Sequence, residues 1–152
     1  MGSVLSPWKK VAFVAVGGLT EVGFAGSFLL VVSHQGRGVV DLASGERVAR
    51  DRQETGAWFD AARGTALGTG PLEGIAVEVT GLAGGQLPGL TEDGWRADAH
   101  DGGVTVSAPG RQPLEIEENE ELRAFGFSPD GGAFIVATPS GVLIYRGDDG
   151  SR

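Results

Sequence analysis

The chain of 152 residues contains no cysteine, only two histidines and one tyrosine. Without cysteine there is no disulfide framework, no catalytic thiolate and no metal site built on sulfur ligands. No apolar run approaches the roughly 18 residues that a membrane-spanning helix requires, so we expect no membrane partner. The chain has no G-x-S-x-G motif, and its glycine pairs do not precede helices. We therefore expect no catalytic residues and no cofactor.

Negative charge is concentrated in one half of the chain. Residues 1–76 hold seven basic and seven acidic side chains, whereas residues 77–152 hold five basic and thirteen acidic ones. An acidic surface disfavours nucleic acids and anionic membranes as partners. Lys9 and Lys10 before the apolar run 11–16 imitate a secretory signal, but the run is short and is better interpreted as a buried strand. We expect a cytoplasmic protein that does not bind nucleic acid.

A six-residue pattern occurs three times, at residues 19–24, 90–95 and 122–127. Each copy has a leucine, three variable residues, a glycine and a large aromatic residue, and each leads into a turn and further strand-like sequence. The pattern predicts the first strand of a repeated antiparallel meander. A degenerate fourth copy surrounds Gly56. The glycines of successive copies are then about 32 to 38 residues apart, a range typical of repeated supersecondary units.

The segment after the third copy carries a resemblance to a known fold. Residues 127–132 read Phe-Ser-Pro-Asp-Gly-Gly. This segment resembles the F-S-P-D-G turn of β-propeller blades of the WD40 and TolB-like type. The resemblance covers about a third of the chain and implies a fold, not an activity. The Trp-Asp dipeptide of WD40 repeats is absent, and 152 residues are few for a closed ring at about 40 residues per blade.

These patterns predict a small, single all-β domain over residues 1–152. Its antiparallel meanders are expected to form propeller-like blades, with repeats near 19–50, 90–117 and 122–146; a β-sandwich or open barrel is the alternative. The apolar run 28–33 is typical of a strand covered on both faces. We expect residues 9–16 to share a sheet with the C-terminal segment, as terminal strands do in propellers.

Three further local expectations concern the core and the middle of the chain. Phe24, Trp95 and Phe127 are expected to face the core. Residues 57–62 are interpreted as one short helical turn, and residues 74–80 as a half-buried strand with Ile75 on its inner face. Residues 1–8 are expected to be a loose lead-in.

The densest polar cluster lies around His34, Arg37 and Asp41. A histidine, an arginine and an aspartate close together can bind an anion or transfer protons. The cluster also includes Glu46, Arg50, Asp51 and Arg52 nearby. The alternative interpretation, which we favour, is a hairpin turn with salt-bridged flanks.

An acidic run follows in the second half of the chain. Strand alternation predicts that Ile116 points inward and its neighbours outward. The run is either a docking face for a basic partner or a solvated edge that blocks strand-to-strand aggregation. Its members are Glu115, Glu117, Glu118, Glu120 and Glu121.

The function predicted from these features is that of a non-catalytic protein-interaction module, of an immunity- or adaptor-like kind. The expected partner is a protein with a basic surface, and homo-oligomerisation is left open. The alternative function is a small-ligand-binding or hydrolytic protein with a polar site around His34, Arg37 and Asp41.

Overall fold

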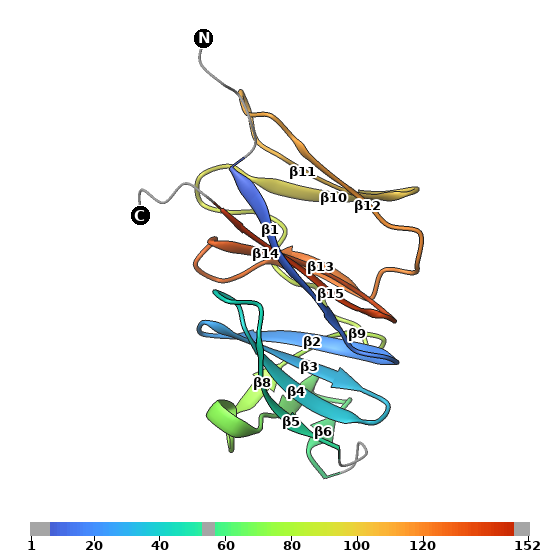
Figure 1. Ribbon diagram of the computed structural model, residues 1–152. Coiled ribbons are helices and arrows are strands. Elements are labelled where there is room, and N and C mark those ends of the chain that lie inside the picture. Colours follow the sequence, from blue (N-terminus) through green and yellow to red (C-terminus); the bar gives the residue numbers. More distant parts are fainter. Residues whose placement is uncertain (1–6, 53–56, 148–152) are drawn as a thin grey trace.

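The computed structural model describes residues 7–52 and 57–147, which form a small all-β domain of four antiparallel sheets (Figure 1). We name the sheets by their position. The N-terminal sheet contains β2 (Leu19–Ala25), β3 (Phe28–Ser33), β4 (Gly36–Asp41), β5 (Arg47–Asp51) and β9 (Thr80–Gly81). The small sheet contains β6 (Phe59–Asp60), β7 (Thr65–Leu67) and β8 (Ala76–Glu78), with the 3-10 turn η1 (Gly70–Leu72) between the last two. The outer sheet contains β10 (Arg96–His100), β11 (Gly103–Ser107) and β12 (Leu114–Glu117). The C-terminal sheet contains β13 (Ala124–Phe127), β14 (Ala133–Thr138), β15 (Gly141–Gly147) and β1 (Trp8–Ala15).

The four sheets are stacked in one column, and a hydrophobic core fills each of the three spaces between them. From top to bottom, Figure 1 shows the outer, C-terminal, N-terminal and small sheets. The two inner sheets are covered on both faces. On β14, Phe134 and Val136 belong to the core shared with the outer sheet, while Ile135 belongs to the core shared with the N-terminal sheet. Strands β3 and β14 are therefore apolar along almost their whole length, which confirms the prediction for residues 28–33.

The first strand pairs with the last one. Strand β1 runs antiparallel to β15, with Trp8 opposite Gly147 and Ala15 opposite Gly141. This confirms the prediction that the N-terminal strand shares a sheet with the C-terminal segment. A bulge between Lys10 and Ala12 shifts the register of β1.

The chain reaches the outer sheet by a long crossing segment, residues 82–95. Pro88 accepts a backbone hydrogen bond of 2.8 Å from Phe127, so this segment covers the free edge of β13. The outer and small sheets therefore lie at opposite ends of the column (Figure 1), and the described residues do not form a closed ring.

The core between the outer and C-terminal sheets is aromatic. Trp8 and Trp95 meet edge to face with ring centroids 5.8 Å apart, and Phe127 and Phe134 lie 4.9 Å apart. Trp95 and Phe127 are buried in this core, and Phe24 packs half-buried against the core between the two inner sheets, which confirms that all three face a core. The prediction of a loose lead-in was wrong for Trp8, which is 5% exposed at the start of β1.

The structure corrects three other local predictions. Residues 90–95 form a turn instead of a strand, because the Thr91 hydroxyl accepts the Trp95 N–H at 3.0 Å and offers the backbone a local partner. Residues 57–62 contain a turn and the short strand β6 instead of a helical turn. The segment 74–80 is broken into β8 and β9, and Ile75 is exposed. Gly56 lies outside the described residues.

Candidate functional site

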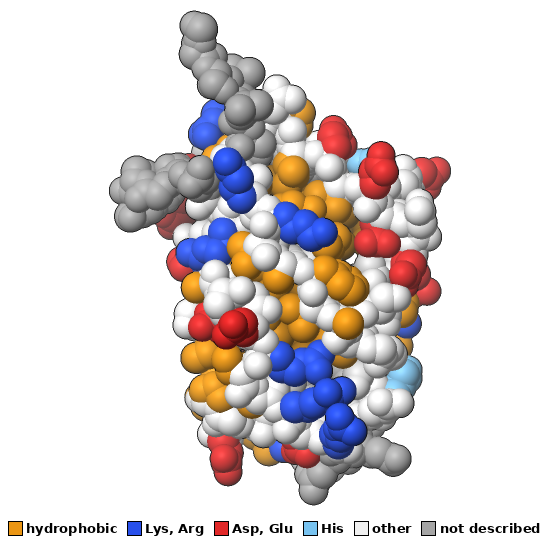
Figure 2. Space-filling view, viewed as in Figure 1, with side chains coloured by type: hydrophobic (Ala, Val, Ile, Leu, Met, Phe, Trp, Pro, Cys, Tyr) orange, Lys and Arg blue, Asp and Glu red, His pale blue; other side chains and the backbone are white. Residues whose placement is uncertain are grey.

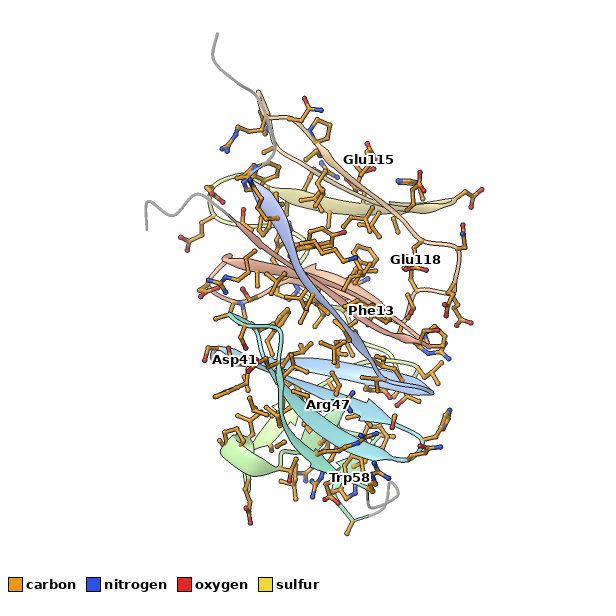
Figure 3. The ribbon with its side chains drawn as sticks, in the orientation of Figure 1. Phe13, Asp41, Arg47, Trp58, Glu115 and Glu118 are labelled. Atoms are coloured by element: carbon orange, nitrogen blue, oxygen red, sulfur yellow. The ribbon has the colours of Figure 1, made fainter. Side chains whose placement is uncertain are left out.

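The three residues of the predicted polar site do not line a common cavity. His34 is exposed at the turn between β3 and β4, while Arg37 and Asp41 lie near opposite ends of β4, about 13 Å apart along the strand. Asp41 accepts a 2.9 Å hydrogen bond from the backbone N–H of Ala43, at the start of the next turn. Figure 3 shows Asp41 well away from Trp58, the ring that Arg37 contacts.

Arg37 is held by contacts within the protein. Its guanidinium donates two hydrogen bonds to one carboxylate oxygen of Asp51, at 3.1 and 2.8 Å, and a third to the carbonyl oxygen of Leu67. It also lies 4.7 Å from the centre of the Trp58 ring, within cation–π range. These contacts join the N-terminal sheet to the small sheet, so Arg37 has a clear structural role.

The acidic run forms one exposed edge of the molecule. Ile116 is buried, while Glu115 and Glu117 are exposed on either side of it, which confirms the predicted alternation. The other three glutamates lie in residues 118–121, part of the connection from β12 to β13, and we call these four residues the acidic loop. Figure 2 shows Asp and Glu side chains gathered along the upper right of the view, where these segments lie.

Few positive charges compensate this edge. Arg123 bonds Glu121 at 2.8 Å, and the imidazole of His100 lies 3.8 Å from Glu115. Glu120 instead accepts the hydroxyl of Ser140 with both carboxylate oxygens at 2.8 Å.

Beside the acidic loop lies an apolar surface that we call the Phe13 platform, made of the exposed Phe13 and the half-buried Leu143 and Tyr145. Phe13 is 48% exposed on β1, the edge strand of the C-terminal sheet. It lies directly opposite Leu143 in the sheet, and Tyr145 follows two residues later on the same face. Its ring covers Gly141, where an added methyl group would lie 2.8 Å from the ring.

A hydrogen bond places the acidic loop at the border of the platform. Burial and, after it, the charge of Glu118 raise the pKa of the Tyr145 phenol. Glu120 holds Ser140, the neighbour of Gly141 beneath Phe13. Figure 3 shows Phe13 and Glu118 on the same side of the molecule, and Figure 2 shows hydrophobic side chains reaching the surface beside the acidic edge.

Sequence reasoning missed the Phe13 platform because the bulge in β1 is invisible in the sequence. Val11 packs against the core shared with the N-terminal sheet, and Ala12 lies opposite Ile144 of that same core. The bulge lets these two neighbours face the same way and turns Phe13 to the opposite face. No local signal in residues 9–16 marks that shift.

Within the described residues, no three His, Asp or Glu side chains gather in a way that would hold a metal ion. In the same part of the chain, no helix has the length and apolar character needed to cross a membrane. A comparison with protein-family models finds no match, and a comparison with curated proteins finds no significant match.

Proposed function

We propose that the chain is a non-catalytic protein-interaction module that binds its partner through the Phe13 platform and the acidic loop. The observation that carries this proposal is the half-exposed ring of Phe13 on the edge strand β1, next to the acidic loop whose Glu120 bonds Ser140. The partner presents a basic surface with an apolar side chain that covers the ring. This composition matches the usual anatomy of an interface, in which an aromatic anchor is surrounded by a polar rim.

The two parts of the surface make different contributions to binding. Burial of the Phe13 ring removes apolar area from water and slows dissociation of the complex. The glutamates, which remain near solvent, attract a cationic partner and raise the association rate, and salt weakens that attraction. Arg37 and Asp41 already form hydrogen bonds within the protein. This favours a protein-binding role for the chain over catalysis at the polar cluster.

The same proposal includes the finer features expected from the sequence. The meanders are blade-like units of the WD40 or TolB-like kind, assembled as an open stack that presents a rigid surface. An adaptor or immunity protein of the cytoplasm, acting on a basic protein and not on nucleic acid, fits the net charge of −8.

The experiment has two stages. A tagged chain first captures partners from native lysate, and the association and dissociation rates of each purified partner are then measured at several salt concentrations. Neutralising Glu117, Glu118, Glu120 and Glu121 to Gln should slow association about tenfold at low salt and flatten its salt dependence. Phe13→Ser should instead raise the dissociation rate by about thirtyfold, the effect of losing an anchor worth about 2 kcal/mol.

Matched controls separate this surface from general effects of charge and exposure. Four exposed carboxylates on or next to the N-terminal and small sheets are neutralised together, and Leu90→Ser removes another exposed apolar side chain. Both controls should bind like the wild type. Unchanged rates in both test variants, or equal losses in the controls, would refute the proposal. The four control carboxylates are Glu46, Asp60, Glu73 and Glu78.

A further inference from the structure

A second surface feature, independent of the Phe13 platform, lies at the edge of the N-terminal sheet. It is a cavity of about 60 Å³ between β4, the edge strand β5 and the turn from β1 to β2. We call it the arginine pocket. Val31 and Ser33 of β3 also line it, and Gly38 of β4 leaves space beside them because it has no side chain. The charged residues of its lining are Arg37, Arg47, Arg50, Asp51 and Arg52.

The lining has an excess of positive charge. Arg37 and Asp51 neutralise each other through their hydrogen bonds. The other three arginines form no ion pair with any acidic residue in the described part of the chain. Figure 2 shows Lys and Arg side chains gathered over the lower half of this face, where β4 and β5 lie, although the protein as a whole is acidic.

Arg47 has a donor that no described residue satisfies. One of its Nη atoms donates to the carbonyl oxygen of Ala15, which ties β5 to the end of β1. Its Nε–H is buried and has no acceptor among the described residues. A buried charged donor without a partner is costly, and native proteins seldom leave one.

The positive charge of Arg50 lies near the unsatisfied donor of Arg47. Burial and, after it, the charge of Arg50 lower the pKa of the Arg47 guanidinium. A water molecule could accept the Nε–H bond, but it would not reduce the repulsion between the two guanidinium groups. An anion does both, because it accepts the hydrogen bond and neutralises the shared charge.

We propose that the arginine pocket binds a tetrahedral oxyanion of the phosphate class, held mainly by Arg47 and Arg50 with Arg52 at the rim. Guanidinium groups match such anions because their N–H donors are arranged as a planar fork. The volume suits one such group and no attached ring system. Arg50 and Arg52 are exposed, so the organic part of a phosphate ester would extend into solvent.

Isothermal titration calorimetry at low ionic strength tests this proposal. Inorganic phosphate, sulfate and glycerol phosphate are titrated into the full chain, with chloride as the reference anion. We expect one phosphate per chain, with sulfate also binding and chloride giving no saturable heat. If glycerol phosphate binds as tightly as inorganic phosphate, the ligand of the pocket is a phosphate ester. If inorganic phosphate binds more tightly, the ligand is the free ion.

Arginine variants locate the binding. Arg47→Gln and Arg50→Gln should each weaken phosphate binding at least about tenfold, because hydrogen bonds between charged groups are among the stronger ones. Arg63→Gln and Arg96→Gln remove the same charge from exposed positions elsewhere and should leave the affinity unchanged. If Arg47→Gln fails to fold, as judged by circular dichroism, the exposed Arg50 and Arg52 variants decide the question.

Absence of saturable phosphate binding to the wild type would overturn the proposal. Equal affinities in the pocket variants and the control variants would overturn it as well. Neither result bears on the Phe13 platform, which lies on another sheet and is tested with a protein partner.

Discussion

Gly23 and Gly126 occupy the same place in the repeated pattern, and each lies where another segment crosses its strand. A methyl group on Gly23 would lie 2.1 Å from the carbonyl oxygen of Glu78. On Gly126 it would lie 2.5 Å from the side chain of Leu87 in the crossing segment. Gly94, in the middle copy, has a different reason: its φ of +97° is a turn conformation that favours glycine. One sequence pattern therefore has two physical causes.

Gly126→Ala should lower the free energy of unfolding by about 1–3 kcal/mol, because the crossing backbone has to move to admit the methyl group. Urea denaturation measures this change. The matched control is Gly89→Ala in the same crossing segment, where an added methyl group meets nothing within 4 Å. The control should change stability by less than about 1 kcal/mol. Equal midpoints for the two variants would show that the close approach at Gly126 costs nothing.

The arginine pocket shows why single residues were harder to assign than strands. The sequence groups Arg37 with His34 and Asp41, because these residues are close along the chain. The fold pairs Arg37 with Asp51, fourteen residues away, through the register of β4 and β5, which agrees with the favoured interpretation of a hairpin with salt-bridged flanks. That register contains a bulge, which places Arg47 and Arg50 at one pocket. The bulge is not encoded in local spacing.

At the scale of elements, the turn between β13 and β14 is closed by its own side chains. Asp130 accepts hydrogen bonds from the Ser128 hydroxyl at 2.7 Å and from the Gly132 N–H at 2.9 Å. These two bonds, with the one from Ser128 as the larger cause, lower the pKa of the Asp130 carboxyl. Gly131 has a φ of +76°, as the Pro-Asp-Gly sequence predicted for a tight turn.

A carboxyl whose pKa is lowered by folding stabilises the protein above its unfolded pKa, and this contribution is lost as the pH falls through the folded value. The wild type should therefore lose stability as the pH falls below about 4. Asp130→Asn should make that loss shallower. Because Asp130 is largely exposed, solvent screens its charge and the difference will be small.

Thermal unfolding between about pH 2 and pH 6 measures this effect, with pH values chosen around the reference pKa of aspartate. Glu73→Gln, which removes a charge from an exposed position, is the control. Parallel curves for the wild type and Asp130→Asn would contradict the assignment of this pH dependence to the turn.

Strands were predictable where both faces are buried. The runs 28–33 and 133–138 are apolar at nearly every position because each contributes to two cores, and they became β3 and β14. The pattern failed at residues 90–95, where the hydroxyl of Thr91 competes with strand pairing. It also failed at Ile75. This residue alternates with the buried Val77 and Val79, but it lies beyond the edge of the core and is exposed. A local side-chain hydrogen bond explains the first failure, and the position of Ile75 outside the core explains the second.

At the scale of the whole molecule, the all-β class followed from the sequence but the open stack did not. The blade-like resemblance carried the expectation of terminal strand pairing, which is confirmed by β1 and β15. The order of the sheets depends on the crossing segment. Its Gly- and Pro-rich sequence predicts a loop but not the path that the loop takes. Its course is fixed by contacts such as the one between Pro88 and Phe127, which lie far apart in sequence.

A stack of four sheets should be most stable in its middle. Amide hydrogens of β3 and β14 are expected to exchange slowest, because their strands are central and buried on both faces. Those of β6 and β7 should exchange faster, since these strands are short and lie at one end of the stack. Hydrogen exchange followed by mass spectrometry measures the order. Uniform protection across all four sheets would mean that the stack opens only as one unit.

The pairing of β1 with β15 has a consequence for biosynthesis. Trp8 and Gly147 are partners, yet the ribosome makes them 139 residues apart. At about 5–20 residues per second, β1 waits on the order of ten seconds before its partner strand exists. During that time the N-terminal and small sheets are already complete, while the tryptophan of β1 has no aromatic core to enter. The newly made chain therefore exposes a hydrophobic strand to chaperones until β15 emerges.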